Sequence, residues 1–438
     1  MMGPTKDRDT LISHVGISMF FLVTLMSWVL VIDALGVLQD REYVIDDHQR
    51  QPQISGIHEL QAQVSFQDRF KDGLCKLLVE PHGYPCEEYT VQTNDGFKLT
   101  IQHIPHGLAG SIGSKETPVF LQHGIMAGGE GWLLNGPNES FAFILADLGF
   151  DVWIGNSRGV EWSHGHESLN SSDPAFWDWT FDELAAYDLP AMMEFVYNKT
   201  SQKIMYVGHS MGTTILLAAL IEQAAHLVDI VRGAVFVCPV ALLTHVTSTF
   251  DQVAAHLFLD QVYNLFHISE FDLHSDVVNF LIDTICAVPN LDCTQLLPNV
   301  AGEGCCVDKD KVPLYLQYYP QPSSTKIIAH YAQILRKGPF RKYDFGRIQN
   351  VAHYNQSIPP EYAFSKFPSA VPLLMVSGTQ DAIANTVDVA IVTQSLQQSV
   401  QGSVILPQYS HVDFILSRTA NVDFWLNVTT WFESLISL

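Results

Sequence analysis

The sequence KIMYVGHSMGTTILLAALIEQ occupies residues 203–223 and changes its pattern twice. Its first part, KIMYV, is short, apolar and rich in strand-forming residues, so it predicts a buried strand. Its last part, TTILLAALIEQ, predicts a helix. Between them stands Gly208-His209-Ser210-Met211-Gly212, a G-x-S-x-G sequence. A serine on a turn between a strand and a helix is typical of a nucleophile elbow, which lifts the hydroxyl above the end of a sheet.

Such a serine needs a base, and the base needs a carboxylate that orients it. In folds with this elbow the three groups follow one another along the chain in the order Ser, Asp or Glu, His. Asp381 comes just after the apolar run VPLLMVSG (371–378), and His411 comes just after GSVILPQ (402–408). We therefore predict Ser210 as nucleophile, Asp381 as acid and His411 as base.

Two other carboxylates compete for the acid position, Asp388 and Asp413, although neither immediately follows a predicted strand. His411 has an alternative reading as a surface histidine. The oxyanion of an acyl-transfer intermediate needs two donors. We predict the backbone N–H of Met211, directly after the nucleophile, and that of Ile125, directly after the strand that ends in His123-Gly124.

Short apolar runs alternate with helix-like segments on both sides of the elbow. A hairpin is predicted over 89–104. The strands predicted after it are 118–124, 150–156, 203–208 and 233–240. The helices predicted between them are 141–149, one that begins at 181, and 213–223. The pattern stops near Ala241 and resumes at 371. Strands that alternate with helices predict an α/β fold whose mostly parallel sheet is covered on both faces. The irregular part predicts a helical, cysteine-containing cap inserted before Asp381 and His411.

The composition restricts the partners of the chain. Of 438 residues, 47% are hydrophobic and 16% charged, which excludes intrinsic disorder and a coiled coil. The formal net charge is −23, so nucleic acid is not an expected partner.

The N-terminal part contains the uncharged run VGISMFFLVTLMSWVLVI, which begins at Val15 and ends at Ile32. It predicts a signal peptide or, alternatively, an uncleaved signal anchor that would hold the protein on a membrane. Acceptor sequences for N-glycosylation agree with the secretory pathway and occur at Asn138, Asn170, Asn198, Asn355 and Asn427. The predicted divisions are 1–36 (signal), 37–80 (N-terminal extension), 81–240 (core), 241–365 (cap) and 366–438 (core).

Seven cysteines are present, and six of them form two local groups, Cys75 with Cys86 and Cys286, Cys293, Cys305 and Cys306. Pairing within each group is expected in an oxidising compartment. Cys238 stands alone in an apolar run and is expected to be a buried thiol. The second group does not have the usual spacing of a zinc site, so we predict no metal and no cofactor.

Several longer segments resemble the acid lipase family of the α/β-hydrolase superfamily, which includes gastric lipase, lysosomal acid lipase and plant relatives. They are HGYPCEEYTVQTNDGF (82–97), LQHGIMAGGEGW (121–132), DVWIGNSRG (151–159), FWDWTFDELAAYDLPA (176–191), GHSMGTT (208–214), HYNQSIPPEY (353–362), SGTQDAIANTVDV (377–389) and YSHVDFI (409–415). Matched position by position, the resemblance implies the same three catalytic residues and the same two oxyanion donors. This sequence departs from the animal enzymes at Met211, which is often Gln there, and from the family's relatives in general at Asn385, where they often have an acidic residue.

The resemblance implies a serine carboxylester hydrolase that cleaves neutral lipid esters, such as triacylglycerols or steryl esters, at a lipid–water interface. It implies a secreted protein or one of the lysosome or vacuole lumen. A small-ester esterase and a lipid acyltransferase with the same triad are alternatives, and a catalytically inactive binding ectodomain is a third.

Overall fold

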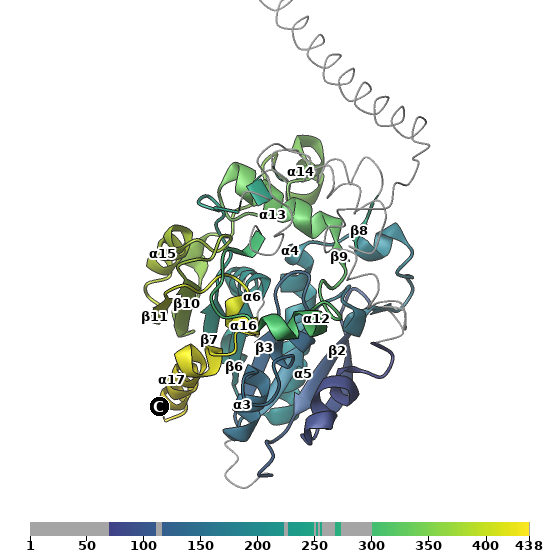
Figure 1. The fold of residues 1–438 in the computed structure, drawn as a ribbon. Helices are drawn as coiled ribbons and strands as arrows, with labels where there is room; N and C mark the ends of the chain where they lie inside the picture. Colours follow the sequence, from purple (N-terminus) through teal and green to yellow (C-terminus); the bar gives the residue numbers. More distant parts are fainter. Residues whose placement is uncertain are drawn as a thin grey trace, which may run out of the picture. The chain divides into compact units, whose positions relative to one another are not determined.

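The computed structural model describes residues 70–110, 116–222, 227–248, 251–252, 255, 268–272 and 300–437. These residues form an α/β fold around a nine-stranded sheet, which crosses the lower half of Figure 1. Its strands are β1 (Glu87–Gln92), β2 (Phe97–Ile104), β3 (Pro118–Gln122), β4 (Asp151–Gly155), β5 (Gly165–His166), β6 (Ile204–His209), β7 (Val231–Val237), β10 (Leu373–Gly378) and β11 (Val400–Leu406).

The sheet is mostly parallel, as the alternation of strands and helices predicts. The main strand order is β1-β2-β4-β3-β6-β7-β10-β11, with β5 paired to β2. All neighbours from β4 to β11 are parallel, and β1, β2 and β5 pair in antiparallel fashion. The predicted hairpin is β1 and β2, and its turn uses a φ of 96° at Gly96. The central strands β3 and β6 are buried along their whole length, which explains their continuous apolar sequence.

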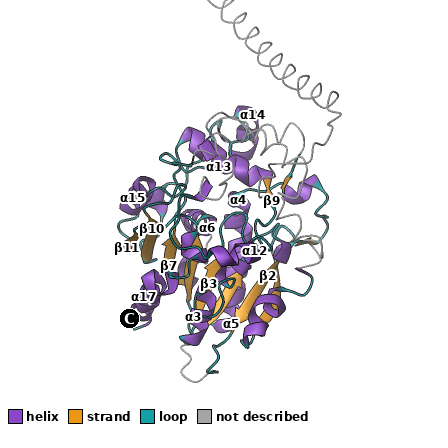
Figure 2. Cartoon of the chain, viewed as in Figure 1, coloured by secondary structure: helices purple, strands orange, loops and turns teal. Residues whose placement is uncertain are grey.

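Helices cover both faces of the sheet (Figure 2). Those of the core are α3 (Phe141–Asp147), α4 (Phe181–Glu183), α5 (Leu189–Thr200), α6 (Met211–Ile221), α7 (Leu227–Ile230), α15 (Thr386–Ser395), α16 (Asp413–Leu416) and α17 (Leu426–Ile436). The predicted capping box at the start of α4 is present: the Thr180 hydroxyl accepts from the N–H of Asp182, and the Glu183 carboxylate accepts from the N–H of Thr180. This reciprocal pair satisfies N–H groups that the helix itself leaves without partners.

A buried ion pair connects the hairpin to the helical layer. The Arg158 guanidinium, whose side chain is 1% exposed, lies 2.6 Å from the Asp95 carboxylate in the hairpin turn and 2.6 Å from the Asp188 carboxylate just before α5. It also lies over the ring of Phe97 at 3.9 Å. Removing one partner of a buried pair leaves the other charge uncompensated, so these three residues depend on one another.

An insertion separates β7 from β10, where the sequence predicts a cap. Its described elements are β8 (Glu270–Phe271), β9 (Ser323–Ser324), α12 (Val312–Tyr315), α13 (Thr325–Lys337) and α14 (Arg347–Tyr354). The Tyr331 hydroxyl on α13 donates to the Thr214 hydroxyl in the first turn of α6, at 3.2 Å. This bond places α13 beside the start of α6, at the carboxyl end of β6, and α13 and α14 lie above α6 in Figure 1. The exact limits of the predicted divisions stay a prediction.

Two disulfides occur in the described residues, Cys75–Cys86 and Cys305–Cys306, and Cys238 is a buried free thiol, as predicted. Cys286 and Cys293 lie outside the described residues, as does the apolar run 15–32. Among the residues that are described, none of the helices combines the length and the apolar character needed to cross a membrane.

Candidate active site

The predicted elbow is a turn at Ser210, which follows β6 and precedes α6. Its backbone has φ 53° and ψ −116°, a conformation that a side-chain-bearing residue seldom adopts. A Cβ atom at Gly208 would lie 2.6 Å from the backbone of Gly212, and one at Gly212 would lie 2.6 Å from the Gln122 carbonyl oxygen. The crossing of β6, α6 and β3 is thus too close for side chains at either glycine, which explains both glycines of the G-x-S-x-G sequence.

The structure brings Ser210, His411 and Asp381 together, although 201 and 30 residues separate the contacting pairs. His411 Nε2 lies 2.8 Å from Ser210 Oγ, and His411 Nδ1 lies 2.9 Å from Asp381 Oδ2 and 3.1 Å from Oδ1. A carboxylate only accepts, so Nδ1 carries the proton and Nε2 accepts from the serine hydroxyl. The three side chains are almost fully buried, at 6% exposed for Ser210 and His411 and 3% for Asp381.

The Asp381 carboxylate is held in its charged form. Its Oδ1 accepts from the N–H of Ile383 at 2.9 Å and of Ala384 at 2.8 Å. Burial acts to raise the pKa of Asp381, but the neighbouring His411 and the hydrogen bonds to the carboxylate outweigh it and hold that pKa below its usual value. The Asp381 carboxylate therefore stays ionised in mildly acidic solution.

The loop that carries the predicted oxyanion donor passes directly beside the serine. A Cβ atom at Gly124 would lie 3.1 Å from Ser210 Cβ, so a side chain there would crowd the serine where the chain passes on its way to Ile125. His123 fixes the start of this loop: its Nδ1–H donates to the Gly124 carbonyl at 2.8 Å, and its Nε2 accepts from the N–H of Ser157 at 3.0 Å. Burial lowers the pKa of His123 to about 4, so the ring stays neutral and keeps both bonds.

Glu130 stabilises the next part of the same loop and has no solvent exposure. Its carboxyl oxygens accept from the N–H of Gly128 at 2.8 Å and from the indole N–H of Trp162 at 2.6 Å. Burial raises the pKa of Glu130 to about 7. Sequence reasoning did not find this residue, because a glutamate in a glycine-rich loop has the appearance of a solvated side chain.

Two further buried side chains contact the backbone of His411. The His209 Nε2–H donates to the His411 carbonyl at 2.9 Å, and burial lowers the pKa of His209 to about 3, so this ring is neutral. The Cys238 thiol lies 3.9 Å from the same carbonyl oxygen, and the Cys238 backbone has a φ of 52° just after β7. The apolar sequence around Cys238 predicts its burial but gives no sign that it reaches the triad.

The competing carboxylates have other partners. Asp388 on α15 accepts from the N–H of His245 at 2.8 Å and contacts the His245 ring nitrogen at 2.7 Å. Asp413 accepts from the N–H of Ser410 at 2.6 Å and from that of Cys306 at 3.0 Å. Asn385 caps α15 by accepting from the N–H of Val387 at 2.9 Å.

Two clusters of metal-ligating residue types occur among the described residues, and their donor atoms have other uses. In the first, His209, Cys238 and His411, both ring nitrogens of His411 and Nε2 of His209 are engaged in the bonds above, and burial raises the pKa of the Cys238 thiol, which disfavours a thiolate ligand. In the second, Cys305, Cys306 and Asp413, the two sulfurs are bonded to each other. Neither donor set fits a resident metal.

A mostly parallel sheet that presents a serine on a strand–turn–helix elbow, with histidine and aspartate on later loops, is the architecture of the α/β hydrolases. Comparison with known proteins agrees. The family description "alpha/beta hydrolase fold" matches residues 117–417, and "partial alpha/beta-hydrolase lipase region" matches residues 75–136.

Similar chains include triacylglycerol lipase 1 of Arabidopsis thaliana, which is 38% identical over 83% of this chain and 91% of the relative. Human gastric triacylglycerol lipase and human lysosomal acid lipase/cholesteryl ester hydrolase are each 36% identical, over 77% of this chain and 85% of the relative. The chain belongs to the acid lipase family of the α/β hydrolases. It is a carboxylic ester hydrolase.

Proposed function

We propose that the protein hydrolyses esters of neutral lipids through an acyl-enzyme on Ser210. The observation that carries this proposal is the position of His411, whose Nε2 lies 2.8 Å from Ser210 Oγ while its Nδ1 contacts the Asp381 carboxylate. The names of the relatives support the substrate class, because they include triacylglycerol lipases and a cholesteryl ester hydrolase.

In the first half-reaction, His411 Nε2 accepts the Ser210 proton while Oγ attacks the ester carbonyl carbon. The Nδ1–H bond to Asp381 stabilises the imidazolium that forms. The carbonyl oxygen becomes negative, and we assign its two donors to the N–H groups of Ile125 and Met211. His411 then gives its proton to the oxygen of the leaving alcohol, the carbon–oxygen bond breaks, and the acyl group stays on Ser210.

In the second half-reaction, His411 takes a proton from water, and the resulting hydroxide attacks the acyl carbon. The bond to Ser210 Oγ breaks, the serine recovers its proton from His411, and the carboxylic acid leaves. The triad is thus restored without any cofactor.

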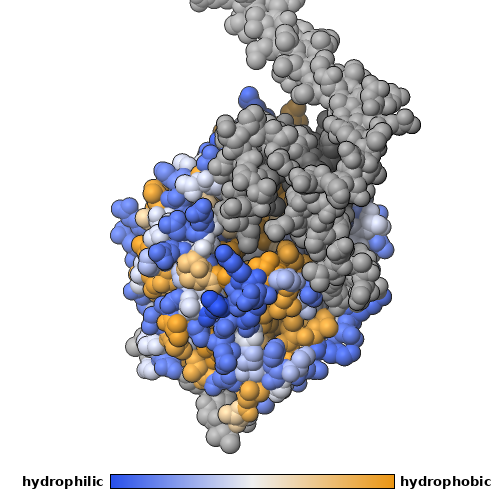
Figure 3. Space-filling model, viewed as in Figure 1, coloured by the Kyte–Doolittle hydropathy of each residue, from blue (hydrophilic) through white to orange (hydrophobic). Residues whose placement is uncertain are grey.

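Exposed apolar side chains on the insertion support a lipid substrate presented at an interface. Ile348 and Val351 on α14 are 89% and 50% exposed, and Ile358 after it is 58% exposed. Hydrophobic residues also occur at several places on the face shown in Figure 3, between hydrophilic ones. Contact with a lipid surface is favourable for such side chains, because it removes their apolar surface from water.

The test is hydrolysis of a long-chain triacylglycerol emulsion and of cholesteryl oleate at acid and neutral pH. Ser210→Ala should lower turnover by at least about 10³-fold, because the nucleophile is removed. Equal turnover in the variant would refute the role of Ser210. Turnover of p-nitrophenyl acetate without turnover of either lipid would instead favour a small-ester esterase, and ester formation with an added alcohol would favour an acyltransferase.

We also propose that the protein enters the secretory pathway through residues 15–32. The disulfides support this location, because such bonds persist in oxidising compartments. Expression in a eukaryotic cell with a C-terminal tag, followed by N-terminal sequencing, distinguishes the two forms of targeting. A shortened chain in the lumen or medium indicates a cleaved signal peptide, an intact chain in the membrane fraction indicates an anchor, and an intact chain in the cytosol refutes the proposal.

A further inference from the structure

A short segment of the insertion, residues 301–306, lies between the loop of Asp381 and the loop of His411; we call it the bridging segment. The Ala301 carbonyl oxygen accepts from the N–H of His411 at 3.1 Å and from the N–H of Ala382 at 3.4 Å. One carbonyl group thus holds both the base residue itself and the residue next to the acid.

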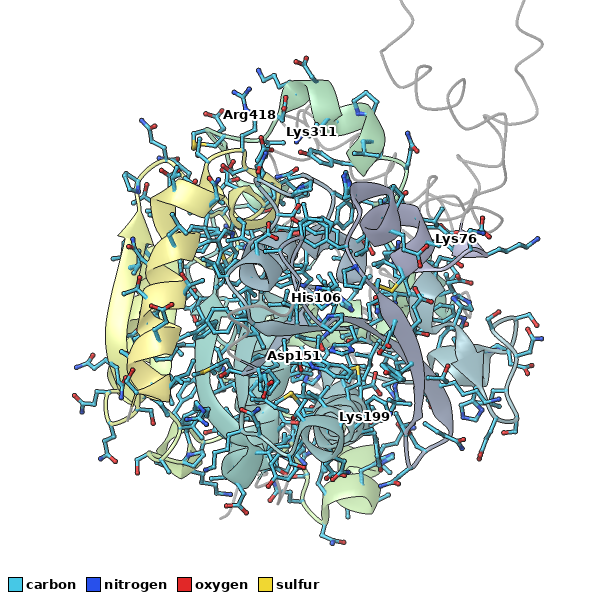
Figure 4. All side chains as sticks on the ribbon, turned by 90° about the horizontal axis from the view of Figure 1, so that it is seen from below. Lys76, His106, Asp151, Lys199, Lys311 and Arg418 are labelled. Carbon is cyan, nitrogen blue, oxygen red and sulfur yellow. A yellow bond between two sulfur atoms is a disulfide. The ribbon has the colours of Figure 1, made fainter. Side chains whose placement is uncertain are left out.

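The other end of the bridging segment holds the His411 loop through Asp413, which has no solvent exposure. One Asp413 oxygen accepts from the N–H of Cys306, and the other accepts from the N–H of Ser410, directly before His411. The Cys306 carbonyl in turn accepts from the N–H of Arg418 at 3.1 Å. Both backbone polar groups of Cys306 therefore bond to the loop that carries the base; Arg418 is labelled in Figure 4, at the same edge of the molecule as Lys311.

The bridging segment fits against the two loops without room to spare. A Cβ atom at Gly302 would collide with the Gln380 carbonyl oxygen, next to Asp381. A Cβ atom at Gly304 would collide with the Asp413 carboxylate and lie 2.7 Å from Ser410 Oγ. A side chain at either glycine would have to displace the acid loop or the base loop.

A disulfide between neighbouring residues closes the bridging segment. Cys305 is exposed and Cys306 half-buried, so a solvent reductant can reach the Cys305–Cys306 bond. The bond forms a small ring that includes the peptide group of Cys306, whose N–H bonds to Asp413. When this ring opens, the backbone at Cys306 can rotate more freely, and Cys306 is the residue that anchors the bridging segment to the His411 loop.

We propose that the bridging segment is a positioning element for the Asp381–His411 pair, and that the Cys305–Cys306 disulfide is a redox-sensitive site that sets this position. A dithiol reductant converts the disulfide to two thiols and is itself oxidised to a disulfide, with two electrons and two protons transferred. The base loop then holds His411 less firmly against Ser210 Oγ, and turnover falls. The proposal rests on the catalytic roles proposed above for Asp381 and His411.

The glycines provide the first test. Gly302→Ala should lower kcat about ten-fold or more and alter the pH profile of kcat, while KM changes little, because a small misplacement of the base affects the chemical step. Gly346→Ala is the matched control: Gly302 and Gly346 have φ values of 96° and 86°, so both replacements strain the backbone, but nothing lies within 4 Å of a Cβ at Gly346. Equal kcat values for the two variants would overturn the positioning role. If Gly302→Ala does not fold, Gly304→Ala serves in its place.

The second test compares the wild type with Cys305→Ser/Cys306→Ser, with and without dithiothreitol. Reduction should lower the kcat of the wild type about ten-fold, to the level of the double variant, and leave the double variant unchanged. Because the double variant keeps Cys75–Cys86, it controls for reduction of that bond. Alkylation followed by mass spectrometry identifies the cysteines that are free thiols, and therefore the disulfides that have been reduced.

Unchanged wild-type turnover with Cys305 and Cys306 fully alkylated would overturn the redox part of the proposal. So would a disulfide map that joins Cys305 to a different cysteine. A wild-type protein that hydrolyses no ester would instead count against the proposed function, so the two failures are distinguishable.

Discussion

At the scale of single residues, the site depends on the partner that each ionisable group has. Asp381, Asp388 and Asp413 all follow the predicted cap in the sequence. Of these three carboxylates, only that of Asp381 contacts the ring of His411. Asp388 pairs with His245, and Asp413 bonds to backbone N–H groups. The order of residues along the chain and the position after a strand both point to Asp381, the carboxylate that contacts His411, and its role as the acid stays a prediction.

Asp381→Asn should lower kcat by about 10³- to 10⁴-fold with little change in KM, because the amide can stabilise the wrong tautomer of His411 and does not stabilise the imidazolium. Asp388→Asn is the matched control and should keep turnover within about two-fold, since that carboxylate bonds to His245 instead. Steady-state kinetics on a soluble short-chain ester measures both. A similar loss in the two variants would remove Asp381 from the acid position.

Glu130 gives a prediction for stability. Because burial raises the pKa of Glu130 from 4.5 to about 7, the folded protein keeps a proton that the unfolded chain has already released between these pH values. Stability should therefore fall as pH rises through this window, by roughly 3 kcal/mol, and level off above it. Glu130→Gln has no proton to lose.

The test is the free energy of unfolding of both proteins from urea titrations at about pH 4 and about pH 8. The variant should become more stable relative to the wild type at the higher pH. A difference between the two proteins that does not depend on pH would contradict the raised pKa.

At the scale of elements, the sequence reveals strands and helices but not the backbone contacts between loops. Residues 203–223 predict β6, the elbow and α6, because apolar periodicity and glycine spacing are local properties. The Ala301 carbonyl bond to His411 could not be predicted, since every residue has a carbonyl and its partner is distant in the chain. The positive φ of Cys238 also could not be predicted from the sequence, because cysteine has no preference for that conformation.

The elbow itself is open to a test. Gly212→Ala should lower kcat/KM by at least about ten-fold, because its Cβ would press on the Gln122 carbonyl, in the strand that leads to Ile125. Gly402→Ala on β11 is the control, since a Cβ there meets only the Leu374 side chain, at 3.0 Å. Labelling with a fluorophosphonate reports the reactivity of Ser210 in both variants. If Gly212→Ala is labelled as fast as the wild type, the prediction is wrong, because the backbone where β6, α6 and β3 cross then accommodates the added methyl group.

At the scale of the whole molecule, the five predicted glycosylation acceptors are spread along the sequence, and the side chains of all five are exposed. They are Asn138, Asn170, Asn198, Asn355 and Asn427. An acceptor must reach the solvent to be modified, and each of these does.

Protein made in a eukaryotic secretory pathway should therefore decrease in apparent mass on treatment with peptide N-glycosidase. A variant with all five asparagines changed to glutamine should not respond. Gel mobility with and without the enzyme measures this. Wild-type protein from such cells that shows no decrease would argue against passage through the secretory pathway.

The order of the three reactive groups along the chain has a consequence during biosynthesis. His411 follows Ser210 in the sequence by 201 residues. Synthesis proceeds from the N-terminus, so a growing chain contains the elbow before it contains the histidine that contacts Ser210. Under the catalytic roles that we propose for these residues, the chain can cleave an ester only after His411 has been joined.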